Sequence, residues 1–156
     1  MRIGALGRAE LGAARAVLAQ ACVFDRAAEV AAEKLFEAGP AGAARAVGAW
    51  EDERLVGVAA VSSRWVRVIG VVPEARGRGA GTALLAACEA AARDAGEATL
   101  RALDQPGNYL APGIDERNGV TIGWLERRGW ERRGEPRVNV AIDVRSNPRV
   151  TAERAG

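Results

Sequence analysis

A run of glycines and arginines in the middle of the chain has the residue types and the spacing to bind a phosphate. It stands between a β-compatible segment and a strongly helical one, and it reads Arg76-Gly77-Arg78-Gly79-Ala80-Gly81. Glycines let a backbone approach a ligand without an intervening Cβ, and the first amides of a helix are unpaired and favour an anion. Three or four such bonds, at roughly 1.5–3 kcal/mol each, would hold a diphosphate. A glycine turn that only begins a helix is the alternative interpretation.

Two widespread phosphate-binding motifs do not fit this run. A Walker loop needs Gly-x-x-x-x-Gly-Lys-Ser/Thr, whereas Lys34 is the only lysine of the chain and lies outside the run. A dinucleotide-binding turn has Gly-x-Gly-x-x-Gly after the first strand, with an acidic residue about 20 residues later. The run here lies in mid-chain and misses that spacing, so it is distinct from both classes.

The composition excludes several kinds of catalysis. The chain has no histidine, which rules out Ser-His-Asp and Cys-His catalysis, histidine-bound zinc and a histidine base. Its two cysteines, Cys22 and Cys88, cannot form a four-thiolate metal site or a disulfide framework. We therefore expect a reduced, cytoplasmic protein without a metal, in which Cys88 is a small apolar residue of a helix and not a nucleophile.

Length and charge are those of one ordinary globular domain. The 156 residues are 49% hydrophobic and 27% charged, and the net charge is only +2. The densest arginines, between residues 127 and 133, alternate with glutamates, which predicts a solvated, salt-bridged surface and no nucleic-acid partner. No segment approaches the roughly 18 apolar residues of a membrane span, so we expect no membrane partner.

Hydrophobic periodicity predicts an α/β (α+β) fold, with one mixed central sheet and the order β-α-α-β-β-β-α-β-α-β-β. Strands are expected at residues 2–6, 44–50, 55–61, 65–72 and 98–103, with a final hairpin of 130–133 and 138–144. Helices are expected at residues 8–21, 25–38, 82–94 and 118–128, the second with Asp25 as N-cap. Residues 1–144 form one predicted domain, and residues 145–156 form a polar tail.

The segment from Val71 to Gly81 resembles the acyl-CoA-binding signature of the GNAT superfamily of N-acetyltransferases. The core of that signature, Arg/Gln-x-x-Gly-x-Gly/Ala, is met by Arg76, Gly79 and Gly81. A later segment resembles the superfamily's second motif, Asn-x-x-Ala-x-x-Leu-Tyr-Glu-Lys-x-Gly-Phe, through Asn118, Glu126, Arg127 and Gly129, with Trp130 for the Phe. The order of elements also matches, and the resemblance covers about residues 2–144.

This resemblance implies acetyl-CoA as co-substrate and assigns its binding residues. Backbone amides of the glycine turn would hold the pyrophosphate, which involves Arg76, Gly77, Arg78, Gly79, Ala80, Gly81 and Thr82. The preceding strand would pair with the pantetheine arm through Val71 and Val72, and the Val71 amide would polarise the thioester carbonyl. Asn118 would contact the cofactor near its sulfur.

The family's customary proton donor is missing. Its Tyr falls on Leu125, and the usual Ala and Leu fall on Thr121 and Trp124. Tyr109 is the only tyrosine of the chain and lies in the loop beside the expected acceptor site. It is a candidate to protonate the thiolate, and a packing or rim residue is the equal alternative.

A general base is not evident either. Many relatives carry Glu on the strand before the glycine turn, where this chain has Ser62, Ser63 and Arg64. Glu74 follows that strand and is expected in solvent. Asp104, Asp115 and Glu116 flank the long loop of residues 104–117, and each can bind a cationic acceptor or relay a proton; we select Asp115 as the catalytic candidate.

The predicted activity is acetyl transfer from acetyl-CoA to a primary amine of a small molecule or protein. Positioning alone can supply roughly 7–11 kcal/mol, whereas a general acid or base adds about 10²- to 10⁴-fold in rate, so positioning and the strand amide can sustain the reaction. A catalytically weak or inactive acyl-CoA sensor is the main alternative, and a structural dimerisation domain is a third. The acceptor is not identified, and a homodimer is compatible with the resemblance.

Overall fold

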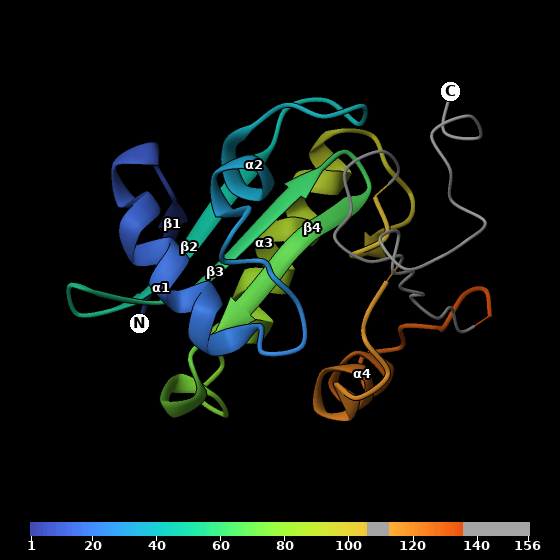
Figure 1. Cartoon of the computed structure of the whole chain (residues 1–156). Coiled ribbons are helices and arrows are strands. Elements are labelled where there is room, and N and C mark those ends of the chain that lie inside the picture. Colours follow the sequence, from blue (N-terminus) through green and yellow to red (C-terminus); the bar gives the residue numbers. More distant parts are fainter. Residues whose placement is uncertain (106–112, 136–156) are drawn as a thin grey trace, which may run out of the picture.

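The computed structural model describes residues 1–105 and 113–135, which form a five-stranded sheet with helices on both faces (Figure 1). The strands are β1 (Arg2–Ala5), β2 (Arg45–Glu51), β3 (Arg54–Ser62), β4 (Trp65–Val71) and β5 (Arg101–Ala102). The helices are α1 (Leu11–Ala21), α2 (Ala31–Phe36), α3 (Ala80–Asp94) and α4 (Gly119–Glu126), with 3₁₀ turns at Arg8–Glu10 and Pro73–Ala75.

The sheet has the order β1-β2-β3-β4-β5 and is mixed. Each of the first four strands is antiparallel to its neighbour, and β5 is parallel to β4. β3 is buried at every position from Leu55 to Ser62, because it is the central strand and both of its faces are covered. The predicted fold class is confirmed, with an α+β arrangement.

Glycines on neighbouring strands show which helix covers which face. A Cβ on Gly57 would lie 2.9 Å from the Leu84 side chain of α3, and one on Gly70 would lie 2.8 Å from Ala21 Cβ of α1. α1 and α3 therefore pack closely on opposite faces of the sheet (Figure 1). Leu18 and Leu84 are fully buried in these two layers.

Three predicted elements differ from the structure. The second helix covers only Ala31–Phe36, and Asp25 is not its N-cap; Asp25 accepts a hydrogen bond from the Ala27 amide within the preceding loop. β5 has two residues instead of six, since it bonds to β4 over a short distance only. Residues 130–133 are not a strand, and their arginines pair with nearby glutamates; the proposed partner at 138–144 lies outside the described residues.

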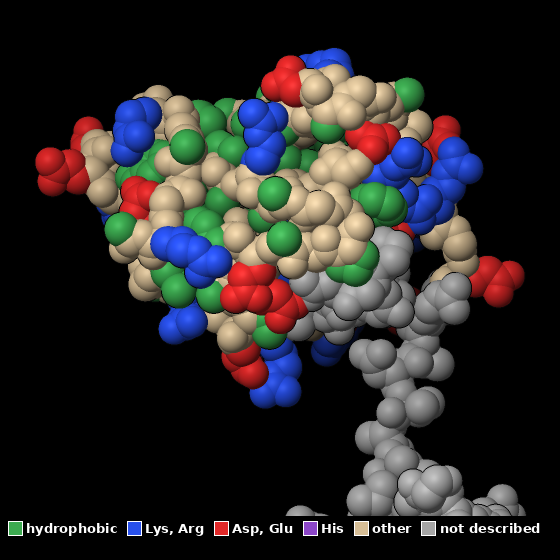
Figure 2. Space-filling view, turned by 90° about the horizontal axis from the view of Figure 1, so that it is seen from above, with side chains coloured by type: hydrophobic (Ala, Val, Ile, Leu, Met, Phe, Trp, Pro, Cys, Tyr) green, Lys and Arg blue, Asp and Glu red, His purple; other side chains and the backbone are tan. Residues whose placement is uncertain are grey.

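The surface mixes charges of both signs. Figure 2 shows one face on which Lys and Arg side chains alternate with Asp and Glu side chains, so this face lacks the basic stripe typical of nucleic-acid binding. In the described residues, no helix is long and apolar enough to cross a membrane. The division into a domain of residues 1–144 and a tail of residues 145–156 extends beyond the described residues and stays a prediction.

Candidate active site

The turn between β4 and α3 has the backbone conformation of an anion-binding loop. Gly77 and Gly79 have φ angles of +75° and +93°, and Arg78 between them does not adopt a positive φ. Such alternation directs successive N–H groups into one concavity. A Cβ built on either glycine meets nothing within 4 Å, so backbone conformation, and not lack of space, favours glycine at both positions.

Helix α3 begins at this turn with unpaired amides. Gly79 is the N-cap and offers no side-chain acceptor, and the amide of Ala83 bonds to its carbonyl at 3.0 Å. The amides of Ala80, Gly81 and Thr82 therefore have no partner within the helix. Because the first turn carries no acidic residue, the positive end of the helix dipole is available to an anion.

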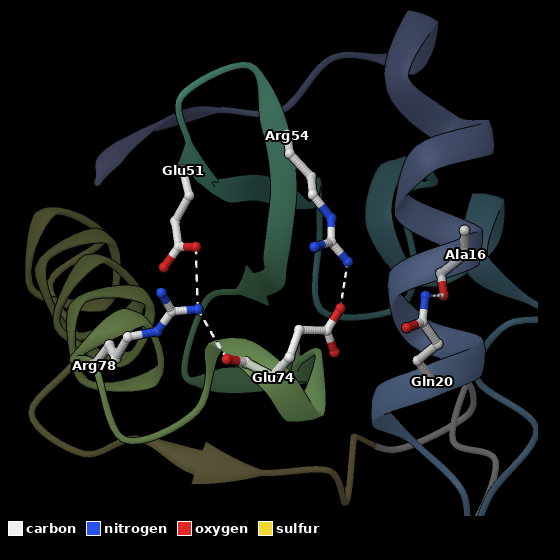
Figure 3. A network of polar contacts seen from close by, with 6 residues as sticks. All are labelled: Ala16, Gln20, Glu51, Arg54, Glu74 and Arg78. Atoms are coloured by element: carbon white, nitrogen blue, oxygen red, sulfur yellow. Dashed lines mark hydrogen bonds and ion pairs between the residues drawn. The ribbon is translucent and has the colours of Figure 1, made fainter.

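The side chains of the two arginines in the turn are engaged by the protein itself. Arg78 donates to the backbone oxygen of Glu74 at 2.8 Å and pairs with Glu51 at 3.1 Å (Figure 3). Arg76 donates to the carbonyl of Val71 at 3.0 Å and to that of the last residue of α1 at 3.2 Å. These contacts fix the turn against β4, α1 and the β2–β3 hairpin, and diphosphate binding by the two residues stays a prediction.

Glu74 belongs to the same network. Its carboxylate pairs with Arg54 at the start of β3 (Figure 3). The backbone amide of Glu74 and the Arg54 guanidinium lower the pKa of this carboxyl group. A carboxylate with a lowered pKa is a weaker base at neutral pH, so the contacts indicate that Glu74 holds the turn and is unsuited to proton transfer.

Among the described residues, the outer edge of β4 is paired only at one end. β5 pairs with β4 only at Trp65 and Val66, and no other strand of the described residues lies on that edge. Val72 is buried and donates to the Val56 carbonyl at 2.9 Å on the β3 side. The backbone groups of Val71 therefore face away from β3, and because Arg76 occupies its carbonyl, the Val71 N–H is the group that an extended ligand chain can pair with there.

The loop after α1 lies beside this edge. Cys22 Sγ is 3.9 Å from the Ile69 carbonyl oxygen, and burial raises the pKa of the Cys22 thiol to about 12. Cys22 is therefore a neutral thiol at physiological pH and not a nucleophile. Further along this loop, the centre of the Phe24 ring lies 5.2 Å from the Arg117 guanidinium of the loop before α4. This contact joins the two loops, which we call the joined loops.

Two carboxylates occupy these joined loops. Burial raises the pKa of Asp25 against the effect of the hydrogen bond from Ala27, and the charge of Asp115 raises it further. Asp115 accepts two hydrogen bonds from the Arg117 guanidinium, at 2.9 and 2.7 Å, which lower the pKa of Asp115 to about 2. Asp115 is thus ionised at neutral pH. Asp25, which the sequence predicted to be a helix cap, binds a proton more tightly than an ordinary aspartate.

The sequence also places the chain among known proteins. Residues 14–111 match the model of the Acetyltransferase (GNAT) family. The chain belongs to this family. No curated protein matches it.

Solved structures share the fold of this GNAT protein at low sequence identity. The aminoglycoside N-acetyltransferase AAC(6')-Iy, in complex with a bisubstrate analogue of CoA, has 16% identity and a TM-score of 0.67, over 91% of this chain and 98% of its own. The ribosomal-protein-alanine N-acetyltransferase of Brucella melitensis biovar Abortus 2308 has 19% identity and a TM-score of 0.66, over 90% and 100%. A transcriptional regulator from Bacillus halodurans C-125 has 15% identity and a TM-score of 0.65, over 90% and 99%.

The segment that resembles the second family motif contains α4. Asn118 is the N-cap of this helix, and its side-chain oxygen accepts from the Thr121 amide at 3.3 Å. Leu125, which the resemblance aligns with the family's Tyr, is buried and has no hydroxyl group to donate a proton. Trp124 packs on the glycine turn, since a Cβ on Gly81 would lie 3.5 Å from its ring. The contact of Asn118 with the cofactor stays a prediction.

The remaining candidates divide between the core and the undescribed residues. Cys88 is fully buried on α3, and burial raises the pKa of its thiol to about 12, which confirms its predicted apolar role. Tyr109 lies outside the described residues, so its role stays a prediction. Across residues 1–105 and 113–135, no three Cys, Asp or Glu residues are grouped to hold a metal ion.

Proposed function

We propose that this GNAT protein transfers an acetyl group from acetyl-CoA to a primary amine of a small molecule or protein. One observation carries the proposal: the free amides at the start of α3 directly follow the open edge of β4. A diphosphate at the α3 amides and a pantetheine arm along the β4 edge would place a thioester beside the joined loops. The CoA analogue bound by the aminoglycoside enzyme supports this donor.

In the proposed reaction the amine nitrogen attacks the thioester carbonyl, the acetyl group passes from sulfur to nitrogen, and the nitrogen loses a proton while the thiolate gains one. The Val71 amide would stabilise the developing oxyanion. Asp115 and the more basic Asp25 would attract a cationic amine and, for Asp25, assist its deprotonation. Tyr109 is the proposed donor to the thiolate, because Leu125 cannot act as one.

The second candidate function is an acyl-CoA-binding module with weak or no catalysis. Leu125 favours it, because a buried leucine replaces the family's customary acid. Both functions require CoA binding, and they differ in turnover. The predicted cytoplasmic location and homodimer remain proposals compatible with either function.

A thermal-shift experiment with CoA tests the shared part of both functions. Ligand at 100 times its Kd stabilises a protein by about 2.7 kcal/mol, which predicts a rise in Tm of roughly 5–10 °C. Gly79→Glu places a Cβ at a φ of +93° and a negative charge against the phosphates, so we expect no shift in this variant. The matched control is Gly12→Glu, at an exposed and open position of α1, which should retain the shift.

Release of free thiol from acetyl-CoA then separates the two functions. We expect thiol release that depends on an added primary amine, measured over a panel of small-molecule and protein amines. CoA binding without thiol release on the whole panel would favour the binding module. The absence of any shift at millimolar acetyl-CoA would contradict both functions.

A further inference from the structure

A third arginine reaches the start of α3 from a distant part of the chain. Arg128 follows α4, and its Nη2 donates to the hydroxyl of Thr82 at 2.7 Å. Its Nη1 donates to the Trp124 carbonyl at 3.1 Å, and its guanidinium lies 4.4 Å from the centre of the Trp124 ring. Three contacts therefore hold one guanidinium in a defined orientation beside the unpaired amides.

The charge of Arg128 is not compensated by the described residues. Arg78 pairs with Glu51, whereas no carboxylate within residues 1–105 and 113–135 pairs with Arg76 or Arg128. Arg76 is directed at carbonyls of β4 and α1, away from the start of α3, and Arg128 is the one that reaches Thr82 there. A guanidinium has more N–H donors than its two hydrogen bonds use. The side chain thus retains both charge and donors for a ligand.

The place of this cation is unfavourable without an anion. The N-terminus of a helix carries partial positive charge, so a cation in its first turn is repelled, and α3 offers no acidic residue there. The carbonyl end of α4 attracts Arg128, which explains the contact with Trp124 but not the extension to Thr82. A bound phosphate would make the convergence of the helix terminus, the hydroxyl and the guanidinium favourable.

We propose that Arg128 binds a phosphate group of CoA, either in the diphosphate or at the 3′ position of the ribose. This inference rests on the proposed function and makes Arg128, instead of the side chains of Arg76 and Arg78, the arginine that contacts the ligand. The planar guanidinium can donate two parallel bonds to one phosphate. The Thr82 hydroxyl orients it, so Thr82 acts as a positioning residue.

Calorimetric titration with CoA and with 3′-dephospho-CoA tests the proposal. Arg128→Met retains an apolar stem on Trp124 and removes the charge, and we expect about 10- to 100-fold weaker CoA binding with a reduced dependence on salt. If dephospho-CoA affinity is unchanged, the partner is the 3′-phosphate; if both ligands lose affinity, it is the diphosphate. Thr82→Val should produce a smaller loss in the same direction.

The matched control is Arg127→Met, which removes the same charge from the neighbouring exposed position. An Arg128→Met affinity within about twofold of the wild type, or an equal loss in Arg127→Met, would overturn the proposal. If Arg128→Met does not fold, as judged by circular dichroism, Arg128→Gln, which also removes the charge, and Thr82→Val give the same decision, because unchanged affinity and salt dependence in both overturn the proposal. Failure of the wild type to bind CoA would overturn the proposed function as well, whereas wild-type binding with unaffected variants overturns only the role of Arg128.

Discussion

At the scale of single residues, two aspartates in the joined loops have opposite surroundings. Burial and the charge of Asp115 raise the pKa of Asp25, while its hydrogen bond from the Ala27 amide and the charge of Lys34 oppose the rise. The Arg117 guanidinium lowers the pKa of Asp115 to about 2. At neutral pH, ionised Asp25 therefore lowers the free energy of unfolding, while ionised Asp115 raises it.

Asparagine substitutions should reveal this difference in their pH dependence. The folded pKa of Asp25 lies above its ordinary value of 3.8, so its favourable contribution is complete below 3.8 and is lost as pH rises through the folded pKa. We expect the free energy of unfolding of Asp25→Asn, relative to wild type, to increase as pH rises from about 3 to 7. Urea unfolding at a series of pH values measures it.

Asp115→Asn is the matched comparison. The stabilising contribution of ionised Asp115 is complete above pH 3.8 and is lost as the pH falls from 3.8 towards 2. The variant should therefore approach wild-type stability at acid pH. Parallel profiles for the two variants would contradict the assignment of Asp25 as the more basic group.

At the scale of elements, α2 depends on a buried arginine of the sheet. The helix has only six residues, and isolated helices shorter than about 12–15 residues are marginal in water. Arg67 on β4 is 3% exposed and donates to the Glu33 carbonyl of α2 at 2.9 Å and to the Glu37 carbonyl just after it. A guanidinium of the sheet thus satisfies carbonyl groups at the end of this helix, a contact that short-range sequence patterns do not predict.

Replacing Arg67 should destabilise the fold more than replacing an exposed arginine. Arg67→Met removes two charged hydrogen bonds worth about 1.5–3 kcal/mol each, although the Glu33 carbonyl keeps its bond from the Glu37 amide, so we expect a loss of about 2–4 kcal/mol in the free energy of unfolding. Arg26→Met is the control, since Arg26 pairs with Glu29 at the surface and its loss should change stability by less than about 1 kcal/mol. Equal effects in chemical denaturation would show that Arg67 does not anchor α2.

At the scale of the whole molecule, the candidate site joins three segments that are far apart in the sequence. The loop after α1 contacts β4 through Cys22 and the loop before α4 through Phe24. α4 contacts the start of α3 through Trp124 and Arg128. Leu125 is the only buried residue of α4, so this helix has little core to hold it and should open at low free energy.

Ligand binding should therefore protect α4 from hydrogen exchange. We expect CoA to slow amide exchange in the glycine turn and also in residues 119–126, because the phosphates would bridge α3 and Arg128. Exchange in the central β3 strand, buried in the absence of ligand, serves as the internal control and should change little. Protection confined to the turn, measured by mass spectrometry, would indicate that α4 does not take part in binding.

Local sequence patterns were sufficient to predict the elements whose conformation depends on neighbouring residues. The glycine turn, the β2–β3 hairpin and α3 follow from nearby residues, because positive φ angles, a tight turn and an apolar stripe are local requirements. Prediction failed at the second helix and at β5, whose extents depend on tertiary partners. Asp25 was assigned as a cap because Ser, Thr, Asp and Asn favour that position, and only the tertiary structure shows the partial desolvation of its carboxyl group and the nearby charge of Asp115.

The sequence by itself determined the family, the sheet with its helices, and a backbone able to bind a phosphate at Gly77 to Gly81. Tertiary structure decided which side chains remain available around that backbone. Arg76 and Arg78 are adjacent to the turn in sequence, yet carbonyl groups and Glu51 occupy them, whereas Arg128 arrives from α4 with an uncompensated charge among the described residues. The physical reason is that a backbone conformation is set by neighbouring residues, while the partner of a long charged side chain is set by whatever folding brings within its reach.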